Sequence, residues 1–171
     1  MAIKWNLPDR PWIKVNTDGA FNAETGKAGG VVWDAEGKLL VAFATPLKAH
    51  SALEAELMAL QLGLELAKEF ERPIWIESDA EQAINLLKGS KWGPTHSCRA
   101  MARLTITKRQ ITFRATFIHR EGNKPADLLA KMGLSLENFS RLTRHTAPRL
   151  LTAMIRMDEM GIPNVRIREE E

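Results

Sequence analysis

The apolar residues of this chain change from alternating to helical spacing near Ser51, and this change limits the folds that the chain can adopt. Before Ser51 apolar and polar residues alternate, which predicts three β-strands, at residues 12–17, 29–33 and 38–45. A hairpin turn is expected at residues 34–37 and a loop at residues 21–27, both rich in turn-forming residues. Three consecutive strands with short connections predict an antiparallel meander.

After Ser51 the apolar spacing is helical. Ser51 is a potential N-cap, and Glu54 follows at the three-residue spacing of a capping box. Leucines recur three or four residues apart, so a helix is expected to end near Phe70, before Pro73. Two further strands are predicted, at residues 74–78 and 111–118. Three further helices are predicted, at residues 80–88, 97–108 and 123–132. The fold class is therefore α/β, with a mixed five-stranded sheet of order βββαβαβα and helices on both faces.

Length and composition indicate one domain with an extension at each end. The 171 residues are 44% hydrophobic and 26% charged, which disfavours a disordered chain. Cys98 is the single cysteine, which excludes an internal disulfide. We expect an N-terminal extension at residues 1–11, a domain at residues 12–134 and a helical C-terminal extension at residues 135–171. Helices of the C-terminal extension, at residues 135–146 and 148–160, either pack on the domain or form a partner-binding pair.

Basic residues are concentrated in one part of the sequence. The formal net charge of the chain is +3, but residues 99–131 contain eight basic residues and two acidic ones. This concentration fits either a polyanionic partner or an ordinary solvated helix face. The first residues do not form a basic and apolar leader, and no uncharged apolar run reaches about 18 residues. We therefore expect a soluble intracellular protein, in a compartment that the sequence does not specify.

Four acidic residues occupy places where a carboxylate is costly unless it is paired or bound to a cation. They follow two predicted strands, at Asp18 and Asp79, or lie near the start of two predicted helices, at Glu56 and Asp127. Each has an ordinary alternative as a turn residue, a helix cap, an exposed residue or a partner of the helix dipole. In a sheet of this order, however, Asp18 and Asp79 would be neighbours, and the first long helix would bring Glu56 to them. Such a cluster needs cations, and oxygen ligands favour Mg²⁺, a pair of which supports phosphodiester hydrolysis.

Five short motifs occur in the order and at the spacing of the type 1 ribonuclease H family, which the sequence resembles. They are VNTDGA at residues 15–20, AGGVV at 28–32, LEAELMAL at 53–60, IESDA at 76–80 and REGNKPAD at 120–127. The resemblance covers residues 12–133 and is greatest to ribonuclease H domains of plant and retroelement-derived proteins. One such motif is weak evidence, whereas five in order are strong evidence.

The resemblance implies endonucleolytic hydrolysis of the RNA strand of an RNA–DNA hybrid with two Mg²⁺ ions, for which Mn²⁺ substitutes. It implies that Asp18 bridges both ions and that Asp79 completes the site of the ion that activates water. Glu56 and Asp127 would complete the second site, on the leaving-group side. Glu54 competes with Glu56 for this role, but Glu56 directly precedes the Leu-Met-Ala run as in the family, and the capping box explains Glu54. The implied partner is nucleic acid, without a membrane or an obligatory protein partner.

The sequence departs from the family pattern at the position of a mobile catalytic histidine, ten residues before the last aspartate. Phe117 occupies that position, and His119 follows two residues later. Because residues two apart in a strand point to the same side, His119 is either an auxiliary catalytic residue or a structural one. Many members of the family lack this histidine, so its loss does not argue for inactivity.

A second departure concerns contacts to the substrate. Ala52 and Leu53 replace two asparagines that often contact the hybrid in the family. Contacts to the 2′-hydroxyl distinguish RNA from DNA, and we expect substrate contacts from Gly19, Asn22, Ser51 and Asn123. Asn123 has an alternative role as a helix N-cap. Residues 89–97 lack the basic insertion of some members, so phosphate affinity would come from residues 99–131 or from another domain.

Two other functions remain open on the sequence alone. A non-catalytic nucleic-acid-binding or scaffold module that keeps the fold would explain the missing asparagines and histidine. The other is a related nuclease with another substrate, such as single-stranded RNA or DNA. The presence of all four carboxylates favours the Mg²⁺-dependent ribonuclease H.

Overall fold

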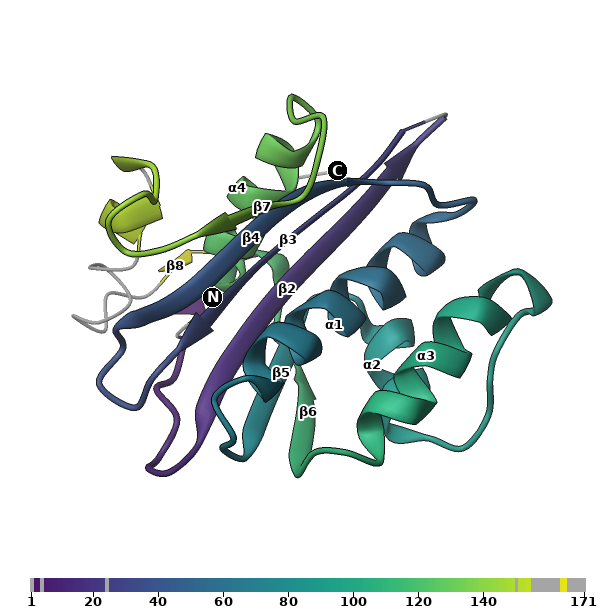
Figure 1. Cartoon of the computed structure of the whole chain (residues 1–171), viewed down its shortest axis with the longest axis horizontal. Helices are drawn as coiled ribbons and strands as arrows, with labels where there is room; N and C mark the ends of the chain where they lie inside the picture. The colour runs from purple at the N-terminus through teal and green to yellow at the C-terminus, as the bar shows by residue number, and fades with distance from the viewer. Residues whose placement is uncertain (1, 4, 24, 150, 155–163, 166–171) are drawn as a thin grey trace.

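The computed structural model describes residues 2–3, 5–23, 25–149, 151–154 and 164–165, and its centre is a six-stranded mixed sheet (Figure 1). The spatial order is β6-β5-β2-β3-β4-β7. The strands are β2 Ile13–Asn22, β3 Thr25–Trp33, β4 Leu39–Leu47, β5 Ile74–Ser78, β6 Phe113–Phe117 and β7 Ser140–Leu142. β2, β3 and β4 form the antiparallel meander, whereas β5 lies parallel to β2 and β6 parallel to β5. Two short strands, β1 Ala2–Ile3 and β8 Asn164–Val165, pair with each other.

Helices lie on both faces of the sheet (Figure 1). They are α1 Ala52–Lys68, α2 Glu81–Lys88, α3 Cys98–Lys108 and α4 Lys124–Gly133. α1 packs on one face, where Gly63 lies against Val15 and Thr17 of β2. α4 packs on the other face, where Gly29 of β3 lies against Ala130. Within the described ranges, no helix is long and apolar enough to cross a lipid bilayer.

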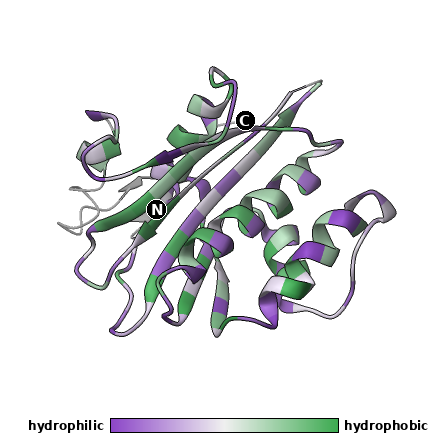
Figure 2. Ribbon diagram, viewed as in Figure 1, coloured by the Kyte–Doolittle hydropathy of each residue, from purple (hydrophilic) through white to green (hydrophobic). Residues whose placement is uncertain are grey.

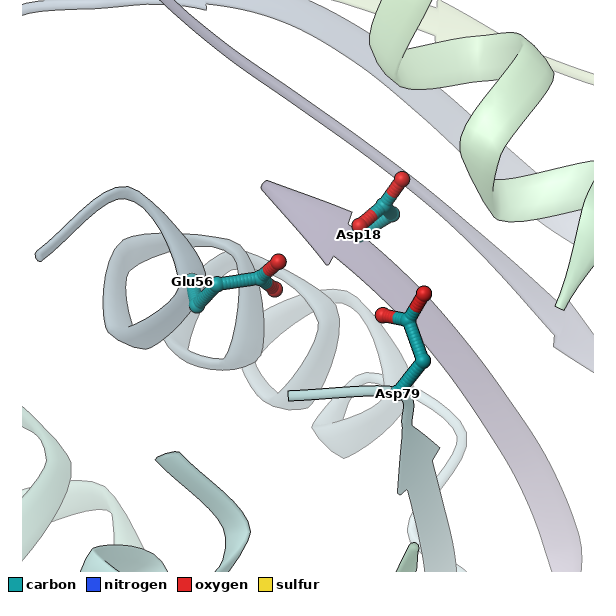
Figure 3. A group of neighbouring side chains, drawn as sticks. All are labelled: Asp18, Glu56 and Asp79. Atoms are coloured by element: carbon teal, nitrogen blue, oxygen red, sulfur yellow. The ribbon is translucent and has the colours of Figure 1, made fainter. Parts of the chain in front are cut away.

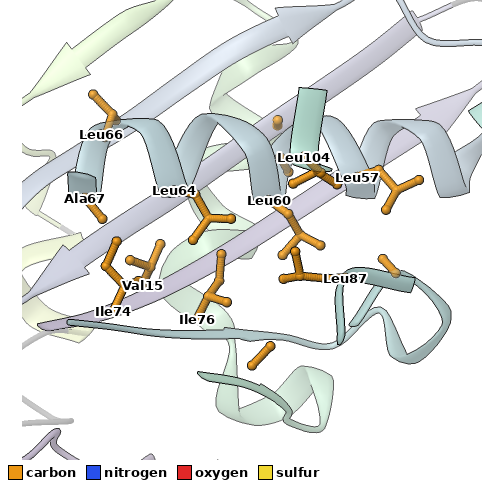
Figure 4. Close-up of a cluster of buried hydrophobic side chains, with 14 of the residues drawn as sticks. Val15, Leu57, Leu60, Leu64, Leu66, Ala67, Ile74, Ile76, Leu87 and Leu104 are labelled. Atoms are coloured by element: carbon orange, nitrogen blue, oxygen red, sulfur yellow. The ribbon is translucent and has the colours of Figure 1, made fainter. Parts of the chain in front are cut away.

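The larger apolar core lies between the sheet and α1 (Figure 4). Leucines of α1 at the predicted helical spacing meet aliphatic residues of β2 and β5, and α2 and α3 close the cluster from the side. The labelled members that are completely buried are Val15, Leu57, Leu60, Leu64, Ala67, Ile74, Ile76, Leu87 and Leu104. Burial of this surface contributes the main favourable term in the stability of the domain.

A second apolar cluster lies on the face of α4. Trp5 and Trp33 pack with their ring centroids 4.9 Å apart, and Leu129 of α4 and Leu151 of the C-terminal segment belong to the same cluster. The N-terminal segment and the C-terminal segment therefore both cover this face of the sheet. The predicted limits of the extensions, at residues 11 and 134, stay predictions.

Strand β2 is buried on both faces, although its residues alternate between apolar and polar (Figure 2). Residues 13–19 of this strand are all buried, including Lys14 and Asn16. In a sheet with helices on both sides neither face of a central strand contacts water, so the polar residues of β2 require polar partners inside the protein.

The predicted strand at residues 38–45 and all elements from there to residue 133 are confirmed to within two residues. The predicted loop at residues 21–27 is wrong, because β2 continues to Asn22 and β3 begins at Thr25. The two strands pair without interruption from Lys14 opposite Trp33 to Asn22 opposite Thr25. Ala23 takes a positive φ of 54°, which allows a two-residue connection. The polar composition of this segment belongs to the outer end of a long hairpin.

The helix predicted at residues 135–146 is also wrong. Ser140–Leu142 forms strand β7, which pairs antiparallel with β4 and extends the predicted five-stranded sheet to six strands. The edge of β4 otherwise presents unpaired N–H and C=O groups, and β7 pairs with the part of this edge at residues 42–44. The ring of Phe139 also stacks on Phe43, with centroids 5.7 Å apart. Residues 149 and 151–154 of the second predicted helix are helical, and residues 155–160 lie outside the described residues.

Candidate active site

Strand β2 brings Asp18 and Gly19 to the point where α1 comes closest to the sheet. A Cβ atom on Gly19 would lie 2.4 Å from the carbonyl oxygen of Ala55, so glycine permits an approach that other residues would block. The backbone N–H of Gly19 donates a hydrogen bond of 3.1 Å to Oε2 of Glu56. Close packing of α1 thereby places Glu56 beside Asp18.

Asp79 reaches the same place from β5. The parallel register sets Ser78 beside Thr17, so Asp79 follows at the level of Asp18. One carboxylate oxygen from each of Asp18, Glu56 and Asp79 lies within 4.8 Å of the others, and the three side chains converge (Figure 3). Three of the four acidic residues singled out in the sequence therefore form one cluster, which we call the carboxylate cluster.

The groups of the carboxylate cluster hold protons more strongly than isolated carboxyls do. Burial and the nearby charges of Asp79 and Asp127 raise the pKa of Asp18 from 3.8 to about 7. Burial and the charge of Asp18 raise the pKa of Glu56 from 4.5 to about 10. Burial also raises the pKa of Asp79. A bound cation would replace these protons and relieve the repulsion between the carboxylates.

The donor atoms of the carboxylate cluster fit a hard divalent cation. Three carboxylate groups offer oxygen ligands, which Mg²⁺ prefers over nitrogen and sulfur. Asp18 is buried, whereas Glu56 and Asp79 are half-buried, so the cluster lies near the surface and keeps access to solvent and substrate. The chemistry of these residues therefore fits the expected magnesium ligands.

Asp127 lies next to the carboxylate cluster but is paired with cations. Lys131 Nζ lies 3.0 Å from Asp127 Oδ2, one helical turn later on α4, and Arg120 Nη2 lies 3.6 Å from Oδ1. The charge of Asp127 contributes to the raised pKa values of Asp18 and Asp79. Asp127 is thus an electrostatic neighbour of the cluster, although its oxygens are not among those that lie within 4.8 Å of one another.

Ser51 and Glu54 cap helix α1, as their spacing predicts. Ser51 Oγ accepts a hydrogen bond of 3.1 Å from the N–H of Glu54, and Glu54 Oε2 accepts one of 3.2 Å from the N–H of His50. The interpretation of Glu54 as a capping residue is confirmed, and Glu56 is the acid that faces the site. Asn22 is exposed at the end of β2. The substrate contacts expected of Ser51 and Asn22 stay predictions.

His119 follows β6 and precedes the short 3-10 helix η2, Arg120–Gly122. Its ring meets the ring of Phe117 edge to face, with centroids 5.1 Å apart and an interplanar angle of 78°. His119 does not belong to the carboxylate cluster. Its auxiliary role stays a prediction.

A buried polar group behind the carboxylate cluster was not identified from the sequence. Lys14, Asn16 and Glu77 join Asn123 in a chain of two hydrogen bonds and one ion pair on the face of α4. Asn123 occupies the N-cap position of α4 without a capping bond, and its Nδ2 donates to the carbonyl of Thr17 instead. A usable signal was present for two of them, since Lys14 and Asn16 precede Asp18 at two-residue steps in β2 and therefore point to the same side.

Comparison with known proteins places this architecture in a family. The profile of the family described as "Reverse transcriptase-like" matches residues 16–133, which include all four acidic residues. The chain is 32% identical over 164 residues to "Putative ribonuclease H protein At1g65750" of Arabidopsis thaliana. That match covers 93% of this chain and 26% of the relative, so the chain spans about a quarter of the length of the curated relative.

Solved structures have the same fold. RNase H1 from the halophilic archaeon Halobacterium salinarum superposes with a TM-score of 0.67 at 22% identity, over 72% of this chain and 98% of that one. LC11-RNase H1, in complex with an RNA/DNA hybrid, superposes with a TM-score of 0.63 at 21% identity, over 72% and 96% of the two chains. These agreements confirm the resemblance to type 1 ribonuclease H that the sequence motifs indicated. The chain therefore belongs to the reverse transcriptase-like family of domains with the ribonuclease H fold.

Proposed function

We propose that this chain hydrolyses the RNA strand of RNA–DNA hybrids endonucleolytically, with two Mg²⁺ ions. The observation that carries the proposal is the carboxylate cluster of Asp18, Glu56 and Asp79 on a ribonuclease H fold. The name of the Arabidopsis relative and the hybrid bound by LC11-RNase H1 support the choice of substrate. Mn²⁺ is expected to substitute for Mg²⁺, because both accept carboxylate ligands.

The acidic residues hold the ions in this proposal. Asp18 would contribute to both ion sites, Asp79 would complete one of them, and Glu56 and Asp127 would complete the other. When bound, the ions supply a hydroxide nucleophile and stabilise the charge of the leaving oxygen. Asp18 and Glu56 hold protons near neutral pH when no cation is present, since their pKa values are about 7 and about 10. Their carboxyl groups therefore release protons as the site is loaded.

Cationic side chains next to the carboxylate cluster provide contacts for the nucleic acid. The side chains of Arg120 and Lys131 are 70% and 57% exposed, respectively, beside Asp127. They are available to neutralise substrate phosphates, which gives binding that weakens with salt. Their ion pairs with Asp127 also balance the charge of this fourth carboxylate beside the cluster.

Further substrate contacts are proposed for Gly19, Asn22, Ser51 and Asn123, and an auxiliary proton-transfer role for His119. The environments of these residues favour Asn22, which is exposed, and Ser51, which is half-buried at the start of α1. The N–H of Gly19 is already bonded to Glu56, and the amide of Asn123 is completely buried. Gly19 and Asn123 would therefore contribute to substrate binding indirectly, because they hold the neighbouring backbone in place.

Two alternatives are tested beside this proposal. One is a non-catalytic module that binds nucleic acid or acts as a scaffold, and the other is a nuclease for another substrate. Metal-dependent cleavage separates the two nucleases from the non-catalytic module. The choice of substrate then separates the nucleases from each other, because fold alone does not determine function.

The experiment is a cleavage assay with a labelled RNA–DNA hybrid, single-stranded RNA, duplex RNA and duplex DNA, each with Mg²⁺ and with Mn²⁺. Asp79→Asn is the matched control, because it removes a carboxylate from the cluster and keeps the size of the side chain. We expect internal cleavage of the RNA strand of the hybrid alone, and its loss in Asp79→Asn. Cleavage of another substrate would favour the second nuclease, and absence of cleavage with either ion would overturn the proposal.

A further inference from the structure

A buried polar residue precedes each of three carboxylates by two or four residues. Asn16 precedes Asp18 by two residues on β2, and Glu77 precedes Asp79 by two residues at the end of β5. Asn123 precedes Asp127 by four residues, and its carbonyl accepts the N–H of Asp127 at the first turn of α4. Asn16 and Asp18 lie on the same side of β2, because residues two apart in a strand do, and hydrogen bonds join Glu77 and Asn123 to Asn16. The polar residues thus form a layer directly behind the acidic ones.

Asn16 is the centre of this layer and connects three elements. Its Nδ2 donates to Glu77 Oε1 over 3.0 Å and to Asn123 Oδ1 over 3.1 Å. Its Oδ1 accepts a hydrogen bond of 2.9 Å from Trp5 Nε1. Asn123 Nδ2 in turn donates to the carbonyl of Thr17 over 2.9 Å, next to Asp18. β2, β5 and the start of α4 are therefore tied together through one amide side chain.

Lys14 completes the layer with a completely buried ammonium group. Its Nζ lies 3.0 Å from Glu77 Oε1 and donates to the carbonyl of Asn6 over 2.8 Å. The ring centroids of Trp75 and Trp5 lie 3.8 and 4.5 Å from Nζ. The pair with Glu77 balances a negative charge that would otherwise be buried next to the carboxylate cluster.

This layer is poorly explained as a source of stability. Burial of two charged groups carries a desolvation cost that their attraction only partly offsets, and well-packed apolar residues are often as stable. Hydrogen bonds with fixed partners and directions, by contrast, define the relative position of the elements that they join. Carboxylates that repel one another benefit from such a frame, because repulsion would otherwise separate them.

We propose that Lys14, Asn16, Glu77 and Asn123 are positioning residues, which set the separation of the carboxylates of Asp18, Asp79 and Asp127 for cation binding. The inference rests on the proposed function only in that the site binds divalent cations. The positioning residues contact other positioning residues and the backbone beside the acids. Partners of this kind, one shell behind metal ligands, typically change metal affinity or activity roughly 10–100-fold when they are lost.

The test compares Asn16→Leu with Ile76→Ala. Asn16→Leu keeps the approximate shape of the side chain and removes its hydrogen bonds. Ile76 is completely buried next to Glu77 on the opposite face of β5, so Ile76→Ala lowers stability without contact to the layer. Mn²⁺ affinity is measured for the full chain by calorimetry or by electron paramagnetic resonance, and melting temperature is measured in parallel.

We expect Asn16→Leu to weaken Mn²⁺ binding about tenfold or more, and Ile76→Ala to leave it unchanged at a comparable loss of melting temperature. Equal Mn²⁺ affinities of the native chain and Asn16→Leu would overturn the proposal. So would a loss of affinity in both variants that follows the loss of stability. Hybrid cleavage by Asn16→Leu should recover as the Mg²⁺ concentration is raised. A variant that had lost a contact with the substrate would not recover in this way.

A double variant provides the test if Asn16→Leu does not fold. Lys14→Met with Glu77→Gln removes both buried charges and keeps an acceptor for the amide of Asn16. If hydrogen-bond geometry positions the acids, the double variant binds Mn²⁺ more tightly than Lys14→Met alone. If it binds no better, the positioning role is overturned. A native chain that binds Mn²⁺ but cleaves no nucleic acid would overturn the proposed function alone, since these binding comparisons do not need cleavage.

Discussion

The two faces of strand β2 are equally buried but have opposite chemistry. Toward α1, Ile13 and Val15 belong to the larger apolar core. Toward α4, Lys14 and Asn16 belong to a hydrogen-bonded layer that ends at Asp18. Because alternate residues of a strand point to opposite sides, one segment of chain supplies both.

Stability and site geometry are therefore carried mainly by separate residues of the same strand. Apolar packing on the face of α1 is non-directional and tolerates small changes in position. The polar layer on the face of α4 has defined partners and directions, and it lies next to groups whose separation matters for chemistry. A change on the face of α1 should therefore alter stability without altering cation binding, whereas a change on the face of α4 should alter cation binding and catalysis beyond any effect on stability.

The largest effect is expected from Asp18→Asn, at the end of the polar face. Loss of several kcal/mol of charge stabilisation from the bound ions corresponds to roughly a thousandfold in rate, at about 1.4 kcal/mol for each factor of ten. The rate of hybrid cleavage at saturating Mg²⁺ measures this loss. The same change removes a carboxyl group from a repelling cluster, so the melting temperature without metal at pH 8 should rise.

Two results for Asp18→Asn would contradict the separate roles of the two faces. A variant that keeps a tenth of the native rate would show that the cluster does not perform the chemistry. A lower melting temperature than that of the native chain would show that the carboxylate end of the polar face also contributes to stability.

The next effect is expected from Leu60→Ala, on the apolar face. Leu60 is completely buried in α1, and removal of such a side chain costs about 2–5 kcal/mol of the free energy of unfolding. Urea unfolding followed by tryptophan fluorescence measures the loss. Leu134→Ala is the matched control, because Leu134 is 53% exposed, and an effect within about 0.5 kcal/mol is expected. A loss of Mn²⁺ affinity in Leu60→Ala, at a temperature where it is folded, would contradict the separation of the faces.

The carboxylate cluster should also give the metal-free protein a distinctive dependence on pH. Burial raises the pKa of Asp18 to about 7 and that of Glu56 to about 10, so the folded state holds protons that the unfolded state releases near pH 4. The stability that these protons supply is complete below the ordinary pKa values of 3.8 and 4.5 and is lost as pH rises through the raised values. Each proton contributes a slope of up to about 1.4 kcal/mol per pH unit.

Urea unfolding in the presence of a chelator, between about pH 5 and pH 9, measures this slope. We expect the free energy of unfolding to fall with rising pH in the native chain, to fall less in Asp18→Asn, and to fall in Leu60→Ala as steeply as in the native chain. Saturating Mg²⁺ should flatten the profile, because the ion replaces the protons. A flat profile without metal would contradict the protonated state of the cluster.

The polar face also marks the limit of what the sequence reveals. Three acids of the site were predicted correctly as neighbours, because strand order and helix spacing bring Asp18, Glu56 and Asp79 to one edge. The alternation in β2 is typical of a strand with one face in water, so it does not reveal that Lys14 and Asn16 are buried. Their burial depends on Trp5 and on the start of α4, which are distant in the sequence and have no local signal.

The C-terminal segment was predicted incorrectly for a similar reason. Residues 135–146 have helical spacing of apolar residues, but the edge of β4 offers hydrogen bonds to any segment that reaches it. Phe139 and Leu142 find apolar partners when Ser140–Leu142 is extended along β4. Tertiary contacts therefore outweigh a local preference that is worth only tenths of a kcal/mol per residue.

The smallest effect is expected from Ser51→Ala, at the start of α1, the helix that packs on the apolar face and carries Glu56. Ser51 Oγ accepts the N–H of Glu54, and loss of such a cap costs about 1 kcal/mol. Glu56 lies in the same first turns of α1, so fraying there should weaken Mn²⁺ binding slightly as well as lower stability. Ser51→Thr is the matched control, since threonine keeps a hydroxyl that can cap the helix.

The result for Ser51 also tests its predicted contact with the substrate. If Ser51 only caps α1, Ser51→Ala changes stability and Mn²⁺ affinity together, and the KM for the hybrid stays the same at saturating Mg²⁺. If Ser51 also binds a phosphate of the substrate, KM rises in Ser51→Ala and Ser51→Thr restores it. An unchanged melting temperature would contradict the capping role, because the hydrogen bond to Glu54 would then contribute nothing to the helix that brings Glu56 to the site.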